Sequence, residues 1–157
     1  MGKRIKGFLP LFLAAILFLA AGCGQKDTTS VSMQEVWDTI QGSIDLPGMR
    51  SLSEKRMMDR YGLDAAALPQ AIVMVSEDSL RVDEVWLIET GSEAEAKELA
   101  ASAEGYIRQI CKEQKDYSPE QYAVAEKGQV VVQGTYVGLF LSPDGEHMAE
   151  IFEKALR

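Results

Sequence analysis

The stretch QVVVQGTYVGLFL, residues 129–141, decides the fold. Two runs rich in β-branched and aromatic residues, 129–133 and 136–141, are separated by Gly134-Thr135. A two-residue gap that contains glycine is typical of a tight β-hairpin turn. In this register Val132 faces Val137 and Val130 faces Leu139, so both strands carry apolar side chains in matching positions.

The hairpin predicts two faces with different roles, because side chains alternate along a strand. A third strand is predicted at 122–126, joined to the hairpin through Lys127-Gly128. The face expected to form the core carries Ala123, Ala125, Val130, Val132, Val137, Leu139 and Leu141. The second face carries Val124, Val131, Tyr136 and Phe140, and Trp86 from an earlier strand is a further candidate. Either helices 33–44 and 53–60 cover this face, or it is a partner surface.

Upstream and downstream patterns complete an α+β fold. Strands are predicted at 71–76 and 84–90, and a long helix at 93–115 begins with the capping box Ser92 to Glu95. A last helix follows Asp144. The expected order is αα-ββ-α-βββ-α, an antiparallel five-stranded sheet with helices packed on it. The ββαβββα part has the layout of profilin-like domains, which transfers no function.

The first 22 residues predict a secretory signal peptide. Lys3, Arg4 and Lys6 precede an uncharged, mostly apolar run at 8–22, which is too short for a membrane-spanning helix. The sequence LAAGC at 19–23 resembles a bacterial lipobox, with Ala20 where Leu is favoured. Lipidation of Cys23 is therefore expected; ordinary secretion and an uncleaved anchor are the alternatives.

A lipidated Cys23 would hold the chain in the bilayer of the cell membrane, on the extracytoplasmic side. Two acyl chains are enough for stable anchoring, since each buried methylene contributes about 0.8 kcal/mol. Residues 23–30 would then be the lipidated cysteine with a flexible tether, and 31–157 a single α+β domain.

Charge excludes some partners. Removing the three basic residues before Cys23 from the 16 in the chain leaves 13, against 24 acidic residues, a net charge of −11. A mature chain this acidic repels the phosphates of nucleic acid, and its binding along an anionic lipid surface is disfavoured.

No motif predicts catalysis, a cofactor or a metal ion. His147, the single histidine, lies near Ser142 and Asp144, but the G-x-S-x-G elbow is missing. Cys111 is expected to be buried in a helix. Glu77-Asp78 and Asp83-Glu84 flank a hairpin where they could meet around a cation, although acidic loops are usually solvated.

From about residue 31 to its end, the chain resembles a domain of unknown function found in small lipoproteins of Gram-positive, clostridial-type bacteria. The likeness rests on Leu46-Pro47-Gly48-Met49, Tyr61-Gly62-Leu63, Asp83-Glu84-Val85, Ser118-Pro119-Glu120-Gln121-Tyr122 and residues 130–136, VVVQGTY. The resemblance implies a lipid anchor and an exported domain, and it brings no catalytic residues.

Three functions remain open from the sequence. The first is a non-enzymatic envelope module that binds a protein partner or a second copy of itself. The second is a lipoprotein that binds a small molecule or peptide between the sheet and the N-terminal helices. The third, an envelope hydrolase, has the weakest support because the sequence shows no reactive constellation.

Overall fold

The structure is a computed structural model that describes residues 30–157. The signal peptide predicted at 1–22 and the lipidation site Cys23 lie outside the described residues. Between residues 30 and 157, none of the helices combines the length and the apolarity needed to cross a membrane.

A five-stranded sheet forms the centre of the fold, and all its strand pairs are antiparallel. The strands follow the spatial order β1-β2-β3-β5-β4. Their bounds are β1 Met49–Ser51, β2 Gln70–Ser76, β3 Glu84–Glu89, β4 Gln129–Gln133 and β5 Tyr136–Leu141. The α+β class and the antiparallel five-stranded sheet are thus confirmed. The 129–141 hairpin is also confirmed, with Val132 opposite Val137 and a positive φ of 60° at Gly134.

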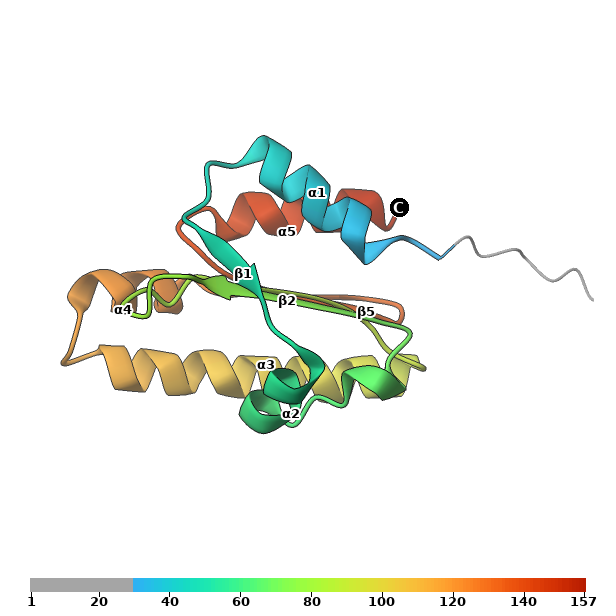
Figure 1. Ribbon diagram of the computed structural model, residues 1–157, viewed down its shortest axis with the longest axis horizontal. Helices are drawn as coiled ribbons and strands as arrows, with labels where there is room; N and C mark the ends of the chain where they lie inside the picture. Colours follow the sequence, from blue (N-terminus) through green and yellow to red (C-terminus); the bar gives the residue numbers. More distant parts are fainter. Residues whose placement is uncertain (1–29) are drawn as a thin grey trace, which may run out of the picture.

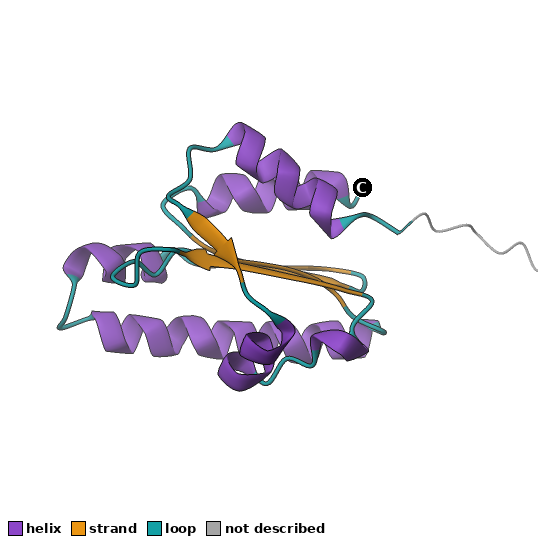
Figure 2. Cartoon of the chain, in the orientation of Figure 1, coloured by secondary structure: helices purple, strands orange, loops and turns teal. Residues whose placement is uncertain are grey.

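Helices cover both faces of this sheet, so the protein has three layers (Figures 1 and 2). Helices α1 and α5 lie on one face, and α2 and α3 lie on the other. Helix α4 follows α3 and packs against it. The bounds are α1 Met33–Ser43, α2 Glu54–Tyr61, the short 3-10 helix η1 Ala65–Ala67, α3 Glu93–Gln114, α4 Pro119–Glu126 and α5 Gly145–Ala155.

Two elements differ from the sequence prediction. Residues 122–126 are helical, because Ser118 caps α4 by accepting a hydrogen bond from the backbone N–H of Gln121 and Pro119 occupies the first turn. The fifth strand is instead β1, which pairs with β2 through Met49↔Ser76 and Ser51↔Met74. The predicted order and its profilin-like layout are therefore wrong in the 118–128 region.

The face beneath α1 and α5 is closed by aromatic packing. Phe140 of β5 and Phe152 of α5 are fully buried, with their ring centroids 5.7 Å apart. Gly138 makes room for these rings, since a Cβ there would lie 2.6 Å from the Phe140 ring and 3.2 Å from that of Phe152. Helix α1 covers this face as one alternative predicted, but its companion is α5 and not residues 53–60.

The opposite face packs against α3 through small side chains. Ala96, Ala100 and Ala103 are buried, which lets the helix approach the strands closely. Trp86 belongs to this face, because it lies opposite Leu139 in the β3–β5 register whereas Phe140 lies opposite Val85.

The predicted partner surface is therefore wrong as one exposed patch. Trp86 and Phe140 are both buried and lie on opposite faces of the sheet. Val124 is buried in α4, and Val131 and Tyr136 are half-buried beside α1 and α5. Of the residues predicted to face the core, Ala123 is exposed in α4 and Val132 is exposed at the sheet edge.

Candidate functional site

A buried carboxylate stands at the start of β3. Glu84 is 2% exposed and points to the α2/α3 face, the same side of the strand as Trp86. Removing a carboxylate from water is costly unless hydrogen bonds and opposite charge compensate it. The groups around Glu84 must therefore compensate the free-energy cost of burying its carboxylate.

Side chains from three elements hold this carboxylate. The indole N–H of Trp86 donates to its Oε1 at 2.5 Å, and the hydroxyl of Tyr106, from α3, donates to its Oε2 at 3.0 Å. The guanidinium of Arg60, from α2, lies 3.5 Å from Oε2 and donates to the Tyr106 hydroxyl at 2.9 Å. We call these four residues with Tyr61 the Glu84 cluster.

Three aromatic rings pack around Glu84. Tyr61, Trp86 and Tyr106 pack with centroid distances of 4.7, 5.3 and 5.7 Å, and Arg60 lies 5.2 Å from the centre of the Tyr61 ring. Burial raises the pKa of Glu84, and the neighbouring Tyr61 hydroxyl, the Trp86 indole N–H and the Arg60 guanidinium offset part of that rise. Burial, and then the charge of Glu84, raise the pKa of Tyr106, so Tyr106 remains a neutral donor.

Two adjoining hollows open beside this cluster. The first, of about 250 Å³, lies between the β2–β3 connection and α3, and Gln114 is in its wall; we call it the Gln114 hollow. The second, of about 410 Å³, lies between α2 and α3 and has Tyr61 in its wall; we call it the Tyr61 hollow. Arg60 and Tyr106 line both hollows, so the Glu84 cluster forms the partition between them.

One residue in the wall of each hollow carries a buried polar atom that makes no hydrogen bond of good geometry, and the Tyr61 hydroxyl also lies near the Glu84 carboxylate, whose pKa it lowers. Within residues 30–157, the side-chain atoms that are buried and make no hydrogen bond are the Tyr61 hydroxyl and Gln114 Oε1. Leaving a polar group in this state costs about 1–3 kcal/mol, and such groups are rare in native proteins. Their position in the walls of two connected hollows points to a binding site.

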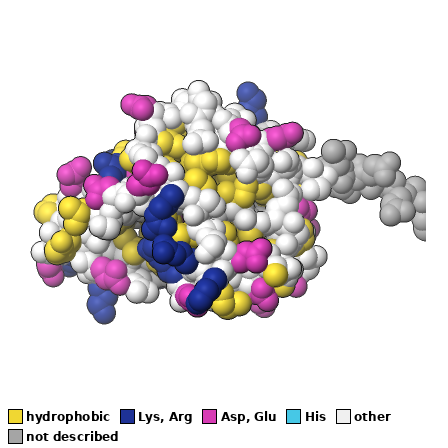
Figure 3. All heavy atoms as spheres, viewed as in Figure 1, with side chains coloured by type: hydrophobic (Ala, Val, Ile, Leu, Met, Phe, Trp, Pro, Cys, Tyr) yellow, Lys and Arg dark blue, Asp and Glu magenta, His cyan; other side chains and the backbone are white. Residues whose placement is uncertain are grey.

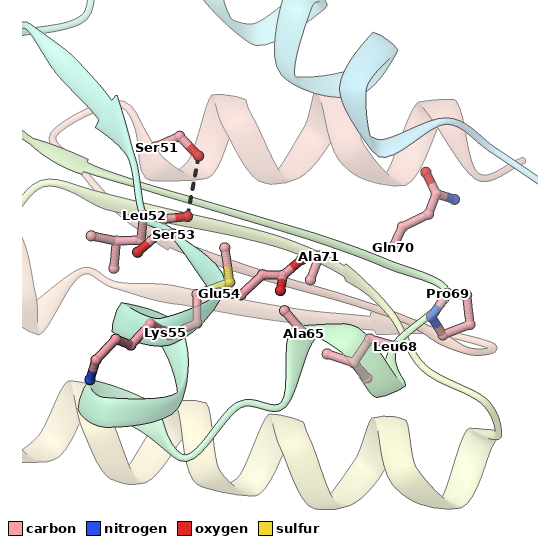
Figure 4. Close-up of a pocket in the computed structure, with 11 residues that line it drawn as sticks. Ser51, Leu52, Ser53, Glu54, Lys55, Ala65, Leu68, Pro69, Gln70 and Ala71 are labelled. Atoms are coloured by element: carbon pink, nitrogen blue, oxygen red, sulfur yellow. Dashed lines mark hydrogen bonds between the residues drawn. The ribbon is translucent and has the colours of Figure 1, made fainter.

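Other hollows lack this feature. A hollow of about 680 Å³ between β1, α2, η1 and the start of β2 is shown in Figure 4. Two of its polar side chains are engaged elsewhere: Gln70 bonds to the backbone of Val31 and Met33, and Lys55 pairs with Asp59.

His147 and Ser142, which are close in the sequence, lie in different surroundings. His147 is exposed in a hollow between α1 and α5, whereas Ser142 is buried and accepts a hydrogen bond from the backbone N–H of Asp144. Asp83 is bound by Arg81 at 2.9 Å. In the described part of the chain, no three His, Cys, Asp or Glu side chains are placed to hold a metal ion. Cys111 lies in α3 and is half-buried, and burial raises the pKa of its thiol.

Of the residues that the sequence singled out as a partner surface, only Trp86 belongs to the Glu84 cluster. Sequence patterns did not point to Arg60, Tyr61 and Tyr106, and they pointed to Glu84 only as part of an acidic pair beside a hairpin. One signal was present: Glu84 shares the strand alternation of Trp86 and Ile88, which places a carboxylate on an apolar face. Nothing in the sequence pairs this strand with Tyr106, 22 residues later in α3.

Comparison with known proteins identifies a family for most of the domain. Residues 42–142 match the family described as Domain of unknown function (DUF4358), which confirms the resemblance to a domain of unknown function. The matched range contains the whole Glu84 cluster. No curated protein matches the chain, and no solved structure matches it either.

Proposed function

We propose that this chain, which belongs to the DUF4358 family of domains of unknown function, is a lipid-anchored binding protein on the extracytoplasmic side of the cell membrane. Its folded domain holds a small polar molecule in the Gln114 and Tyr61 hollows. The anchor rests on the lipobox-like sequence before Cys23, and the ligand site rests on the Glu84 cluster.

The two unpartnered polar atoms carry this proposal. A molecule that lies in both hollows, on either side of Arg60 and Tyr106, would contact Tyr61 and Gln114, and a small shift of these side chains would let it bond to the Tyr61 hydroxyl and Gln114 Oε1. The expected gain in binding free energy is large, because the free protein already bears the cost of removing these two atoms from water.

The covered sheet argues against binding a partner on a sheet face. Helices α1 and α5 occupy one face and α2 and α3 the other, so neither offers an open apolar surface. The site favours a ligand that enters between helices, which is a common place for small-molecule sites.

The chemistry of the cluster favours binding without catalysis. Both oxygens of Glu84 are engaged, so the carboxylate orients Tyr106 and Arg60 and is not poised to take a proton from a substrate. The nearby hydroxyl of Ser102 donates to the backbone carbonyl of Glu98, one turn earlier in α3, and faces no base.

Native mass spectrometry of the full chain, extracted from membranes in mild detergent, tests the ligand site. We expect a non-covalent adduct that is retained in the wild-type chain and lost or reduced in the Tyr61→Phe variant. The matched variant Tyr122→Phe removes a hydroxyl from exposed α4 and should keep the adduct. An adduct that is absent, or that persists equally in both variants, would contradict the proposal.

The mass of the mature chain tests the anchor separately. The proposal expects an N-terminus at Cys23 carrying a diacylglyceryl group, and a Cys23→Ser variant that carries no acyl mass. A chain that still begins with Met1, or a Cys23 without acyl mass, would show that the anchor does not exist.

A second candidate function, self-association, is favoured by the edge strand β4. This strand is paired on one side only, carries no charged residue, and leaves Val132 41% exposed. Open, uncharged edges pair readily with another strand, so two copies could join their β4 strands in antiparallel fashion.

Light scattering of the full chain in detergent tests this second function. A dimer should be lost in Val132→Lys and retained in Leu80→Lys, a variant that alters another exposed apolar residue, 66% exposed. A monomeric wild-type chain, or a dimer that survives Val132→Lys, excludes pairing through β4.

A further inference from the structure

Three arginines line a third hollow beside the proposed site. This hollow, of about 340 Å³, lies between β1 and α2 and is lined by Arg50, Leu52, Arg56, Asp59 and Arg60; we call it the arginine hollow. It adjoins the Gln114 hollow, because Arg50 and Arg60 line both. Figure 3 shows Lys and Arg side chains gathered over β1 and α2.

This concentration of positive charge is unusual for the chain, whose formal net charge is −8. Within the described residues, Arg50 and Arg56 make no ion pair or side-chain hydrogen bond. The acidic residue of the hollow, Asp59, is held by Lys55 at 2.5 Å. Arg50 and Arg56 are exposed beside the hollow, and their guanidinium donors are not engaged by other described residues.

The third arginine is oriented by the Glu84 cluster. The Tyr106 hydroxyl accepts from one nitrogen of Arg60, and Glu84 lies 3.5 Å from the same nitrogen. The guanidinium carries five N–H donors in a planar fork, so the remaining donors stay available. Its side chain is 49% exposed and keeps access to solvent and to a ligand.

We infer that the arginine hollow binds the anionic group of the ligand, a carboxylate or a phosphate. This inference rests on the proposed function and names the chemical class of the molecule. The anionic oxygens contact Arg50, Arg56 and Arg60, and an uncharged polar part extends past Arg60 to Gln114 Oε1. Arginine is suited to this role because its fork matches carboxylate and phosphate oxygens in a bidentate way.

The experiment titrates the full chain in detergent with inorganic phosphate and, separately, with acetate, at constant ionic strength set by chloride. Arginine Nε–Hε signals in NMR spectra report binding. We expect saturable shifts of a small set of arginine signals with one anion, and an affinity about 10- to 100-fold lower in Arg50→Gln and Arg56→Gln. Arg108→Gln, which removes an arginine paired with Glu104 on the exposed side of α3, is the control and should leave the affinity unchanged.

The outcomes separate this inference from the proposed function. Shifts that do not saturate, or that weaken equally in Arg108→Gln, overturn the arginine site. If a native adduct depends on Tyr61 but not on Arg50 or Arg56, only the inference about the anion is wrong. A last experiment floats the Cys23→Ser chain with phosphatidylglycerol vesicles. Flotation that Arg56→Gln abolishes would identify the phosphate as that of a lipid headgroup. If the chain does not float, the anion belongs to a free molecule.

Discussion

Two neighbouring tyrosines should respond in opposite ways to the loss of a hydroxyl. Both rings pack against Trp86, but their hydroxyls differ: Tyr106 donates to Glu84 and accepts from Arg60, while the Tyr61 hydroxyl is buried without a hydrogen bond. The substitutions Tyr106→Phe and Tyr61→Phe make the same chemical change at two positions of one cluster.

The expected magnitudes follow from these contacts. Tyr106→Phe removes a hydrogen bond to a buried carboxylate, which is worth about 1.5–3 kcal/mol, and should lower the free energy of unfolding by that amount. Tyr61→Phe removes a polar atom whose desolvation is uncompensated. It should leave the free energy of unfolding unchanged or raise it by up to about 1–3 kcal/mol in the absence of ligand.

Chemical denaturation of the ligand-free full chain in detergent, followed by tryptophan fluorescence, measures both values. The slope with denaturant must be the same in all variants for the comparison to hold. If Tyr61→Phe destabilises the protein as much as Tyr106→Phe, the Tyr61 hydroxyl has a partner within the protein, and the argument for a ligand at that atom is refuted.

The remaining predictions concern pH, packing and capping. Because burial raises the pKa of Glu84, its protonated form favours the folded state; the advantage is present below the unfolded value, near 4.5, and is lost as pH rises through the folded pKa. The difference in unfolding free energy between the wild type and Glu84→Gln should therefore fall as pH rises above that value. The same difference for Glu98→Gln, which changes an exposed residue, should not depend on pH. A difference for Glu84→Gln that rises with pH would contradict a raised pKa of Glu84. Gly138→Ala should lower the free energy of unfolding by about 1–3 kcal/mol, because its Cβ would lie 2.6 Å from the Phe140 ring. Gly42→Ala in α1 has open space around it and should raise the free energy of unfolding by up to about 1 kcal/mol. Thermal denaturation distinguishes the two variants, and equal effects would refute this description of the packing. Ser118→Ala should cost about 1 kcal/mol if Ser118 caps α4, and an unchanged denaturation midpoint would remove that cap from the account.

Much of the fold follows from local patterns in the sequence. The hairpin at 129–141 has a two-residue turn with glycine in the required conformation, and α3 begins where Ser92 accepts a hydrogen bond from the backbone N–H of Glu95. These signals depend on neighbouring residues, so they can be recognised without knowledge of the tertiary structure.

The two wrong assignments have different causes, a local helix start that was overlooked and a strand pairing that is entirely tertiary. In residues 122–126, the alternation of Ala and Val suggested a strand, while the stronger indication was the Ser118-Pro119 helix start. Strand β1 has three residues and exists through its pairing with β2, which lies more than 20 positions later.

The site was harder to predict than the fold, because it joins residues distant in the chain. Arg60, Glu84 and Tyr106 come from α2, β3 and α3, and their meeting depends on both helices packing on the same sheet face. Without that packing, the sequence shows a carboxylate on an apolar strand face and gives no indication that Arg60 and Tyr106 contact it.

A high-resolution structure of the protein purified from its native membranes is the most direct measurement of the central claim. We expect an organic molecule in the two hollows beside the Glu84 cluster, within hydrogen-bond distance of both the Tyr61 hydroxyl and Gln114 Oε1. Hollows that contain ordered water alone, or side chains rearranged so that both atoms bond within the protein, would contradict the claim that this domain binds a ligand there.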